Sequence, residues 1–371
     1  MSGPLFVFAG GGTGGHLFPG IAVAGSLKQL HPNAEFLFAG SGRTVEQSIL
    51  ADAGFEAFPL NVPAVASARR HPLKFLRGHF ADWMTARQMM REKKPAAIIG
   101  LGGLASFAVC DAAGRAQVPV ILLEQNVIPG RATRRLAHSF PLCTSFPETT
   151  DHLRCAKKIV CTGNPLRPEI VRSQSAPENI ARRKTLLILG GSQGSTTVND
   201  AVLLAAHTIL DADPQSPLRS WNVIHQTGTG EDERAEEAWK SLEIKATVKP
   251  FFSDLPSLYP KAGLVISRSG ATTLAELACL KLPSILLPYE HARDDHQTAN
   301  ARAFESAGAA KLIDTREPDL ESRLADALGE LIEDRSQRES MSKNCESLAR
   351  PDAADRVARF VCEQAGLTAQ S

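Results

Sequence analysis

Short apolar runs bounded by glycine or proline alternate along the chain with longer amphipathic stretches. In the first half these runs cover residues 5–8, 36–38, 97–99 and 118–123, and a helix is expected near residues 20–30. A second series covers residues 185–189, 264–266 and 284–287, with a helix expected from about Thr197. Strand-length apolar runs that alternate with helical stretches are typical of a parallel sheet covered by helices. The pattern therefore predicts an α/β protein built from two Rossmann-like halves.

A turn-rich segment, residues 162–168, lies between the two halves and contains two prolines. We place the hinge there, which gives an N-terminal domain of residues 1–165 and a C-terminal domain of residues 166–350. Residues 351–364 form one more predicted helix with an apolar face, and we expect the stretch 351–371 to pack back on the N-terminal domain. The length of 371 residues suits two such domains.

Composition narrows the classes of partner and compartment. The net charge of +1 provides no general basic field for nucleic acid, so an anionic partner must meet a local patch. The seven cysteines form no C-x-x-C pair, which fits a reducing cytoplasm. The apolar run of residues 5–9 is too short for a signal peptide or a membrane span, and no later run is long enough to span, so we expect neither feature. Any contact with a membrane is therefore expected from one side.

Each half opens with a strand that ends in a glycine-rich loop and leads into a helix. Residues 10–15 satisfy G-x-G-x-x-G, residues 190–194 form the second loop, and residues 100–103 form a third at another strand end. Uncovered backbone N–H groups and the positive end of a helix bind anions, so we favour phosphate cradles. A tight turn without a ligand is the alternative. Neither of the two opening loops has the G-K-[ST] ending of a nucleoside triphosphatase.

Polar residues at the predicted strand ends are candidates for chemistry. His16 directly follows the first glycine loop, where a neutral imidazole could accept a proton from an attacking hydroxyl; a capping or packing histidine is the alternative. Glu124, Gln125 and Asn126 follow a fully apolar strand, at the edge where open parallel sheets bind ligands. The alternative for this triplet is a cap for the helix beyond Pro129.

The second half offers two further polar segments. Residues 267–276 run from strand to helix with several hydroxyls, and Glu276 in the helix suits a ribose diol or, alternatively, only the helix dipole. Residues 288–297 carry many donors and acceptors, as sugar hydroxyls require. Asp211 with Asp213 and Asp294 with Asp295 are the candidate metal carboxylates. We nevertheless predict no essential metal, because helix ends and arginines such as Arg167 and Arg268 could balance a leaving diphosphate.

The stretch of residues 69–91 is basic and amphipathic together. Its apolar side chains recur at helical spacing, which fits either a core-facing helix with a solvated basic face or a helix on an anionic bilayer. The sequence leaves these two interpretations equally open.

Taken together, these motifs resemble the MurG family, in family order and from residue 10 to about 300. The residues that carry the resemblance are Gly11-Gly12-Thr13-Gly14-Gly15-His16 with Pro19-Gly20, Gly100-Leu101-Gly102-Gly103, Glu124-Gln125-Asn126, Gly163-Asn164-Pro165-Leu166-Arg167, Gly190-Gly191-Ser192-Gln193-Gly194, His225-Gln226, Arg268-Ser269-Gly270-Ala271 and Gln297.

The resemblance implies a GT-B glycosyltransferase, with two Rossmann-like domains facing an interdomain cleft. It implies inverting, metal-independent transfer of N-acetylglucosamine from UDP-N-acetylglucosamine to the 4-hydroxyl of the N-acetylmuramoyl unit of undecaprenyl-linked lipid I. The product would be lipid II for peptidoglycan, and no cofactor would be needed. The resemblance also implies a peripheral protein on the cytoplasmic face of the bacterial inner membrane, with partners among wall-synthesis and cell-division proteins and none among nucleic acids.

Residue roles follow from the same motifs. His16 would be the general base. The donor would contact Thr13, Gly14, Gly15, Asn126, Arg167, Ser192, Phe252 (meeting uracil through its backbone), Ala271, Thr272, Thr273, Leu274, Ala275, Glu276 and Gln297. The acceptor diphosphate would rest on Gly12, Gly102, Gly103 and Glu124. The membrane would meet residues 65–90, through Leu73, Phe75, Leu76, Arg77, Phe80 and Trp83.

The chain departs from the family pattern at two places. Residues 104–107 read Leu-Ala-Ser-Phe where relatives carry a tyrosine and a Ser-Gly-Pro, which affects the acceptor loop. His296 replaces a glutamine, and the segment 290–294 is one residue longer, which affects the sugar contacts.

Two rival hypotheses remain. An NADP-dependent oxidoreductase would use Gly10, Gly12 and Gly15 with Ser41-Gly42-Arg43, although the loop at Gly190 counts against it. A non-catalytic nucleotide-sugar sensor on the same fold would bind the donor and form no product.

Overall fold

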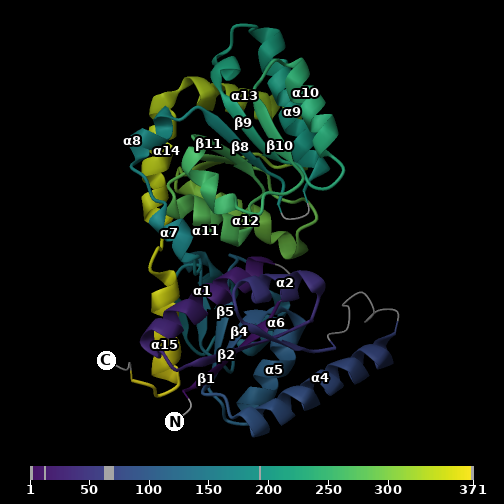
Figure 1. Cartoon of the computed structure of the whole chain (residues 1–371), viewed down its shortest axis with the longest axis vertical. Coiled ribbons are helices and arrows are strands. Elements are labelled where there is room, and N and C mark those ends of the chain that lie inside the picture. The colour runs from purple at the N-terminus through teal and green to yellow at the C-terminus, as the bar shows by residue number, and fades with distance from the viewer. Residues whose placement is uncertain (1–2, 12–13, 62–70, 192–193, 369–371) are drawn as a thin grey trace. The chain divides into compact units, whose positions relative to one another are not determined.

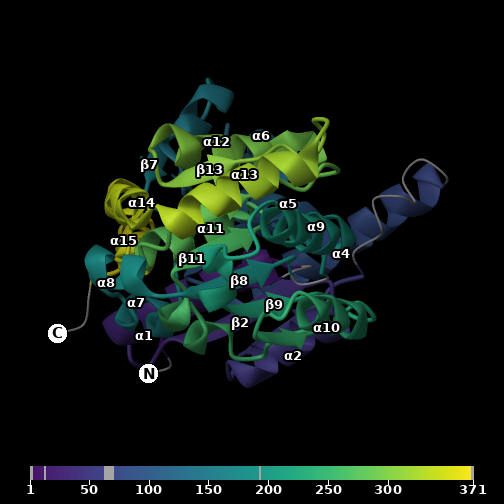
Figure 2. The same ribbon diagram turned by 90° about the horizontal axis from the view of Figure 1, so that it is seen from above.

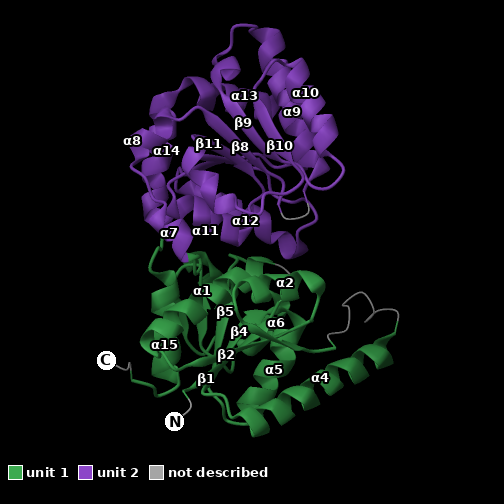
Figure 3. Cartoon of the chain, in the orientation of Figure 1, with its two compact units in different colours: residues 1–167, 350–371 green, residues 168–349 purple. Residues whose placement is uncertain are grey.

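The computed structural model describes residues 3–11, 14–61, 71–191 and 194–368. The chain divides into two compact units (Figure 3), and each is described here by itself. Unit 1 consists of residues 1–167 and 350–371, and unit 2 of residues 168–349. The predicted sites Gly12, Thr13 and Ser192, and the part of the basic stretch before residue 71, lie outside the described residues.

Unit 1 contains a parallel sheet with the strand order β3-β2-β1-β4-β5-β6-β7 among the described residues. Its strands are β1 (Leu5–Gly10), β2 (Glu35–Gly40), β3 (Glu56–Pro59), β4 (Ala97–Gly102), β5 (Val120–Glu124), β6 (Leu142–Thr144) and β7 (Ile159–Cys161). Strands β2 and β3 lie on one side of β1, and β4 to β7 lie on its other side, so the strand order switches between β1 and β4. Open parallel sheets bind ligands at the carboxyl ends of the strands at such a switch point.

Helices cover both faces of the sheet of unit 1 (Figure 1). They are α1 (Gly14–Leu30), α2 (Thr44–Asp52), α4 (Pro72–Lys93), α5 (Gly103–Arg115), α6 (Arg131–Leu136), the 3-10 turn η1 (Pro147–His152) and α15 (Ala353–Gln364). Side chains of β1 alternate between the faces: Phe6 and Phe8 pack with α1, α2 and α15, whereas Val7 and Ala9 pack with α4, α5 and α6.

Unit 2 contains a second parallel sheet, with the strand order β10-β9-β8-β11-β12-β13 among the described residues. Its strands are β8 (Thr185–Leu189), β9 (Asn222–Gln226), β10 (Ala246–Lys249), β11 (Leu264–Ser267), β12 (Ser284–Leu286) and β13 (Ala310–Leu312). The strand order of this sheet also switches beside the first strand of the unit, here between β8 and β11.

The helices of unit 2 also pack as layers on its sheet. The α-helices are α7 (Pro168–Arg172), α8 (Pro177–Arg182), α9 (Thr196–Ala212), α10 (Asp232–Ser241), α11 (Ala271–Cys279), α12 (His296–Ser306), α13 (Leu320–Glu333) and α14 (Arg335–Leu348). The 3-10 turns are η2 (Pro217–Ser220), η3 (Leu255–Ser257), η4 (Tyr259–Lys261) and η5 (Arg293–Asp295). One face of the sheet packs with α9, α10 and α13, of which α9 and α13 lie against each other (Figure 2).

Two details refine the elements expected from the sequence. The first helix begins at Gly14, before the expected start near residue 20, and it contains Pro19 in its interior. The last helix, α15, packs on α1 within unit 1, where the Ser26 hydroxyl donates a hydrogen bond of 2.7 Å to Asp355. In the described part of the chain, no helix combines the length and the apolar character needed to cross a membrane.

Candidate active site

Two glycine-rich loops of unit 1 contact each other at the carboxyl edge of its sheet. The register between β1 and β4 shifts at Gly10, whose φ is 130°. A Cβ atom on Gly10 would lie 2.5 Å from the Gly102 carbonyl oxygen, so only glycine allows this approach. Gly103 also has a positive φ, of 82°, and a Cβ there would meet no described atom within 4 Å. The space beside the Gly103 Cβ position is therefore free of described atoms, which is compatible with an anion-binding loop.

His16 lies in the first turn of α1, against the second of these loops. A Cβ on Gly102 would lie 3.5 Å from Cδ2 and 3.6 Å from Nε2 of His16. The imidazole is half-buried and stands beside the two loops at the strand edge. The structure thus brings together His16, Gly102 and Gly103 as the sequence predicts, within one unit.

Glu124 holds the loop that follows β5. One carboxylate oxygen accepts hydrogen bonds from the backbone and the side-chain N–H of Asn126, at 3.1 and 3.3 Å. The other oxygen accepts the Gly130 N–H at 2.9 Å, next to the start of α6. Glu124 is buried and its negative charge would repel a diphosphate. These contacts favour the loop-capping alternative for Glu124, and they orient Asn126.

Arg167 lies over the ring of Phe18, with 4.6 Å between the guanidinium carbon and the ring centroid. Phe18 in turn stands 2.8 Å from the position of a Cβ on Gly14. This stacking carries the positive charge of Arg167 to the N-terminal part of α1, where an anion is expected. Nearby in sequence, Asn164 is buried, and neither its Oδ1 nor its Nδ2 has a hydrogen-bond partner among the described residues.

Sequence reasoning missed Glu46, a buried carboxylate of α2. Its oxygens lie 2.6 Å from the position of a Cβ on Gly11 and 3.0 Å from that on Gly40, and one accepts a hydrogen bond of 2.7 Å from the Ser41 hydroxyl. The carboxylate of Glu46 thus occupies the space beside Gly11 and Gly40. A lone acidic residue in an amphipathic helix gives no signal in the sequence.

The glycine loop of unit 2 closes on itself and on the next strand. The Gly194 N–H donates to the Gly191 carbonyl at 3.1 Å. Gly194 has a φ of 75°, and a Cβ there would lie 2.3 Å from the Thr227 carbonyl oxygen. Gly191 has a φ of 93° and, among the described atoms, nothing within 4 Å of its Cβ position. The loop thus combines a tightly packed end at Gly194 with an open backbone at Gly191, which suits a phosphate cradle.

The N-terminus of α11 presents backbone and hydroxyl groups, as predicted. Thr272 and Thr273 are half-buried, whereas Leu274 is fully buried, so Leu274 can meet a ligand only through its backbone. Glu276 is buried, and its Oε2 accepts a hydrogen bond of 2.7 Å from the buried Tyr259 hydroxyl. Tyr259, in η4, is a further residue that the sequence did not single out.

Gln297, the second residue of α12, has a fixed amide. Its Oε1 accepts the backbone N–H groups of Ser269 and Tyr289, at 3.3 and 3.0 Å, and its backbone carbonyl accepts the Ser269 hydroxyl at 2.8 Å. Because the amide oxygen binds the protein, the amide presents its N–H donors to a ligand. This is the orientation that a sugar hydroxyl acting as an acceptor requires.

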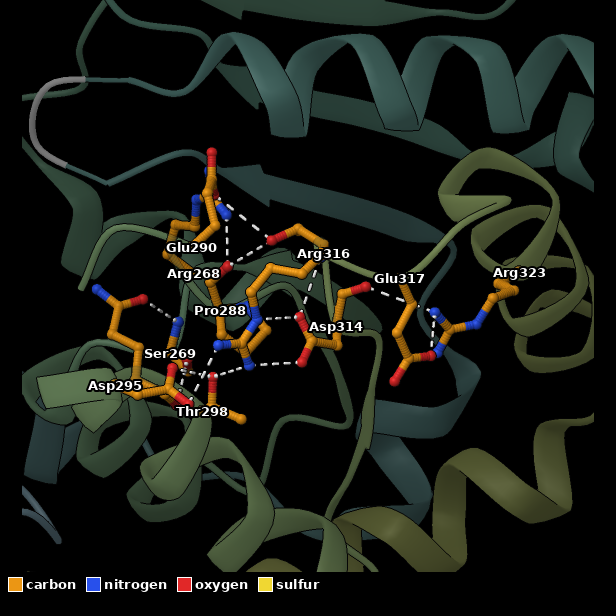
Figure 4. A network of polar contacts seen from close by, with 12 residues as sticks. Arg268, Ser269, Pro288, Glu290, Asp295, Thr298, Asp314, Arg316, Glu317 and Arg323 are labelled. Atoms are coloured by element: carbon orange, nitrogen blue, oxygen red, sulfur yellow. Dashed lines mark hydrogen bonds and ion pairs between the residues drawn. The ribbon is translucent and has the colours of Figure 1, made fainter.

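Arg268 connects several segments of unit 2 to one another. Figure 4 shows its guanidinium beside Glu290, at 3.2 Å, and beside the Pro288 carbonyl, at 2.7 Å. It also donates at 2.7 Å to the hydroxyl of Ser195, the N-cap residue of α9. Burial lowers the pKa of Arg268, and the Glu290 carboxylate counters this shift. These contacts differ from the expected role of Arg268 in balancing a diphosphate, because they bind its Nη atoms to the protein.

The candidate metal carboxylates have protein partners. Asp295 accepts the Thr298 hydroxyl at 2.6 Å and pairs with Arg316 at 3.3 Å (Figure 4), while Asp211 pairs with His207 at 3.0 Å. In the described ranges, no three His, Cys, Asp or Glu side chains come together so as to hold a metal ion. The hydrogen bond from Arg316 lowers the pKa of Asp314 in the same network.

The basic amphipathic stretch forms α4, and its apolar stripe faces solvent. Exposed fractions are 76% for Leu73, 60% for Leu76, 62% for Phe80 and 45% for Met84. The face that packs on unit 1 consists instead of Asp82, Ala86, Met89 and Met90. The core-facing interpretation is therefore wrong for these four apolar residues, while Trp83 and Phe75 are half-buried.

Comparison with known proteins identifies the class and then the family. The chain resembles the crystal structure of Acinetobacter baumannii MurG, with a TM-score of 0.77, 25% identity and coverage of 97% of this chain and 99% of that one. It also shares its fold with a UDP-N-acetylglucosamine 2-epimerase, with a TM-score of 0.70 and 16% identity over all of this chain and 97% of the other. The fold is that of a GT-B glycosyltransferase, as predicted.

Proteins related in sequence identify the family within this class. The N-terminal and C-terminal domain models of glycosyltransferase family 28 match residues 6–140 and 185–357. Two relatives bear the name UDP-N-acetylglucosamine–N-acetylmuramyl-(pentapeptide) pyrophosphoryl-undecaprenol N-acetylglucosamine transferase. The protein from Hahella chejuensis is 36% identical, covering 98% of this chain and 99% of its own length. The protein from Anaeromyxobacter dehalogenans is 35% identical, covering 96% and 91%. The chain belongs to the MurG family of glycosyltransferases, which confirms the resemblance.

Proposed function

We propose that the chain transfers N-acetylglucosamine from UDP-N-acetylglucosamine to the 4-hydroxyl of the N-acetylmuramoyl unit of lipid I, forming lipid II. The observation that carries this proposal is the presence of one glycine-rich cradle at the carboxyl edge of each sheet, beside His16 in unit 1 and at Gly191 in unit 2. Each cradle suits an anion, and both the nucleotide donor and the pyrophosphoryl acceptor in the relatives' name carry a diphosphate.

Unit 2 is the proposed site of the donor. The open backbone at Gly191, with Ser192 as predicted from the family, would meet the diphosphate together with the N-terminal turns of α11, residues 271–276. Glu276 would accept the ribose hydroxyls, and the N–H donors of Gln297 would hold the sugar. The Phe252 backbone would meet uracil; because its N–H already donates to Gln226 at 3.0 Å, its carbonyl is the group that would accept the uracil N3–H.

Unit 1 is the proposed site of the acceptor and of the base. The acceptor diphosphate would rest on Gly102 and Gly103, with Gly12 as predicted from the family. Asn126 (oriented by Glu124), Arg167 and the loop of residues 13–15 would approach the sugar and diphosphate of the donor. These assignments are compatible with the contacts of unit 1 described above.

The proposed reaction is a direct displacement. His16 accepts the proton of the acceptor 4-hydroxyl, whose oxygen forms a bond to the anomeric carbon while the bond from that carbon to the UDP oxygen breaks. Attack from the face opposite to UDP converts an α-linked donor into a β-1,4-linked product. Backbone N–H groups and helix ends would balance the charge of the leaving diphosphate, so the reaction is proposed to need no metal.

We propose that α4 binds an anionic bilayer and so places the chain on the cytoplasmic face of the inner membrane as a peripheral protein. Support comes from the exposed stripe of Leu73, Leu76, Phe80 and Met84, which lies on a helix that also exposes Lys74 and Arg77. Exposed apolar side chains beside basic ones are typical of helices that lie in the membrane interface. Association with wall-synthesis and cell-division proteins remains a prediction of the family resemblance.

The decisive experiment follows transfer of labelled N-acetylglucosamine from UDP-N-acetylglucosamine to a lipid I analogue, with and without EDTA, by chromatography of the product. Product in the presence of EDTA would support the metal-independent transferase. Product only after a metal is added would retain the transferase and overturn the account of the leaving group. Binding of the donor without product would favour the sensor.

A further inference from the structure

Gln226 occupies a position between the two parts of the proposed nucleotide site. It is the last residue of β9, which pairs with β8 on one side and β10 on the other, so that Gln226 lies beside Leu189 and Lys249. Strand β8 leads into the glycine loop of unit 2, and β10 leads to Phe252. The side chain is 5% exposed, so its amide is committed to the protein interior.

The two ends of the Gln226 amide bind these two segments. The Nε2 donates a hydrogen bond of 3.1 Å to the Gly191 carbonyl, and the Oε1 accepts the Phe252 N–H at 3.0 Å. The Gly191 carbonyl also accepts the Gly194 N–H, which closes the loop. Only an amide supplies both a donor and an acceptor at this length, so the contacts fix both the residue type and its orientation.

A second set of buried side chains forms hydrogen bonds around the carboxyl end of β9. His225 is fully buried; its Nδ1 accepts the Trp239 N–H at 3.2 Å, and its Nε2 lies 3.0 Å from Asn199 Oδ1. Because the indole can only donate, the proton of His225 is on Nε2 and is donated to Asn199. Asn199 then donates at 3.0 Å to the Thr227 carbonyl, which is the group in close approach to Gly194.

We infer that Gln226 is a positioning residue that holds the diphosphate loop and the uracil-contacting segment at a fixed separation, so that a single nucleotide engages both. The inference rests on the proposed function of unit 2 as the donor site. A rigid ligand that bridges two segments binds tightly only if the protein orders them beforehand, since otherwise binding must supply the ordering free energy. The buried hydrogen bonds among His225, Trp239 and Asn199 keep the position of Gln226 itself constant.

The experiment measures the dissociation constants of UDP and of uridine by calorimetry, on the full-length protein. Q226M keeps the length of the side chain and removes both hydrogen bonds, and Q226E keeps an acceptor for the Phe252 N–H but loses the donor to the Gly191 carbonyl. Q174M is the matched control, because Gln174 is an exposed glutamine of unit 2 that donates to Cys279. Circular dichroism and the thermal midpoint report whether each variant is folded.

We expect Q226M to weaken UDP binding about tenfold and uridine binding severalfold, consistent with the loss of two buried hydrogen bonds. Q226E should bind uridine nearly as the wild type does and UDP as poorly as Q226M, because only one of the two contacts is restored. In the transfer assay, the KM for the donor should rise in Q226M while kcat and the KM for the acceptor stay constant. A purely structural role would lower the active fraction and the midpoint without this selective change in KM.

The outcomes separate the inference from the proposed function. If the wild type fails to bind UDP, the donor assignment of unit 2 fails, and the inference fails with it. If the wild type binds UDP and both Q226M and Q226E bind it equally well, the donor site stands and the positioning role is wrong. Should Q226M not fold, the differential effect of Q226E on UDP and uridine decides alone.

Discussion

The two glycine-rich edges of the molecule are built in different ways. In unit 2 the loop is braced by side-chain amides and a guanidinium: Gln226 binds Gly191, Gln297 binds the segments after β11 and β12, and Arg268 binds the N-cap of α9. In unit 1 the loops touch each other through glycine backbones, as at Gly10 and Gly102. A braced edge suits a small polar nucleotide that is bound in one pose, whereas an edge of open backbone suits a large lipid-linked substrate of which only the diphosphate is held.

The charges at the two edges differ as well. Unit 1 buries the carboxylates Glu46 and Glu124 beside its loops, and both accept hydrogen bonds from their own surroundings. Carboxylates repel anions, so attraction for an anion must come from N–H groups and Arg167. Unit 2 also buries a carboxylate, Glu276 in α11, but the neutral amide of Gln226 binds its glycine loop. These differences are compatible with the proposed division, in which unit 1 supplies the base and unit 2 binds the nucleotide. Four predictions follow from the structures of the two units.

The largest expected effect is on catalysis. H16A should lower turnover about 100-fold or more, in the range that loss of a general base produces. The affinity for UDP should not change, because His16 is not among the residues proposed to contact UDP. Transfer kinetics and UDP calorimetry measure the two quantities. H138A is the control, since His138 is an exposed histidine of unit 1 whose ring nitrogen lies 3.0 Å from the Cys155 carbonyl. Unchanged turnover in H16A would remove His16 from the role of base.

The next effect concerns how tightly the glycine loop of unit 2 is packed, and Gly54, in the turn between α2 and β3, provides the matched control. Gly194 and Gly54 share a φ of 75°, but a Cβ on Gly194 would lie 2.3 Å from the Thr227 carbonyl while nothing described lies within 4 Å of that on Gly54. We expect G194A to lower the free energy of unfolding by about 3 kcal/mol and G54A by about 1 kcal/mol, because only the first adds a clash to the backbone strain. Urea unfolding monitored by tryptophan fluorescence measures both. Equal losses would show that the loop of unit 2 relaxes and is not braced.

A third effect follows from His225 of β9, which is buried and neutral in the folded protein. Burial, and secondarily the charge of Arg234, lower the pKa of His225 from 6.5 to about 3. Between these two values the unfolded chain binds a proton that the folded protein does not, so stability is full above pH 6.5 and falls as the pH decreases toward 3. At pH 5 the expected loss is about 2 kcal/mol relative to pH 7.

Urea unfolding of unit 2 at pH 7, 6 and 5 checks this expectation. H225N should reduce the pH dependence over this range, even if it lowers stability overall. A wild type whose stability is constant from pH 7 to 5 would contradict the buried neutral state of His225.

Much of the fold and part of the site could be predicted from the sequence. Apolar runs at strand spacing predict both parallel sheets because every buried parallel strand needs them. The sequence predicts that the first glycine loop and His16 share one edge, and the structure has Gly10, Gly11 and His16 at the end of β1, because residues adjacent in sequence at a strand end are adjacent in space. The start of α1 at Gly14 was missed, since glycines and Pro19 are poor helix residues and packing of Leu17 and Val23 on the sheet overrides that preference.

The remaining features depend on contacts between distant segments. Gln226 meets Gly191 and Phe252, and Tyr259 meets Glu276, only after the sheet has formed. Hydrophobic periodicity in the sequence cannot predict such pairs, because it describes one helix or strand at a time. The same limit applies to α4: helical spacing predicts an apolar stripe, but whether that stripe is buried depends on which neighbours cover it.

The last prediction concerns α4, because unit 1 exposes an apolar helix face there. The large apolar side chains that the described part of unit 2 exposes lie apart from one another, with Leu204 on α9 and Phe251 and Tyr289 outside helices and strands. The double variant of L76S with F80S should reduce binding to vesicles containing anionic lipid about tenfold, because partial burial of two such side chains contributes about 1.4 kcal/mol. L204S should leave vesicle binding unchanged. Since Leu76 and Phe80 are 60% and 62% exposed, the urea midpoint should also stay constant.

Sedimentation with vesicles measures this binding, and turnover with a water-soluble acceptor analogue gives the second readout. If α4 only brings the protein to the bilayer, the double variant loses vesicle binding and keeps its turnover on the soluble acceptor. Loss of both would mean that this face of α4 also shapes the acceptor site, so that chemistry and membrane contact in unit 1 are not separable. Unchanged vesicle binding would leave the exposed stripe to another partner and would contradict the proposed membrane role of unit 1.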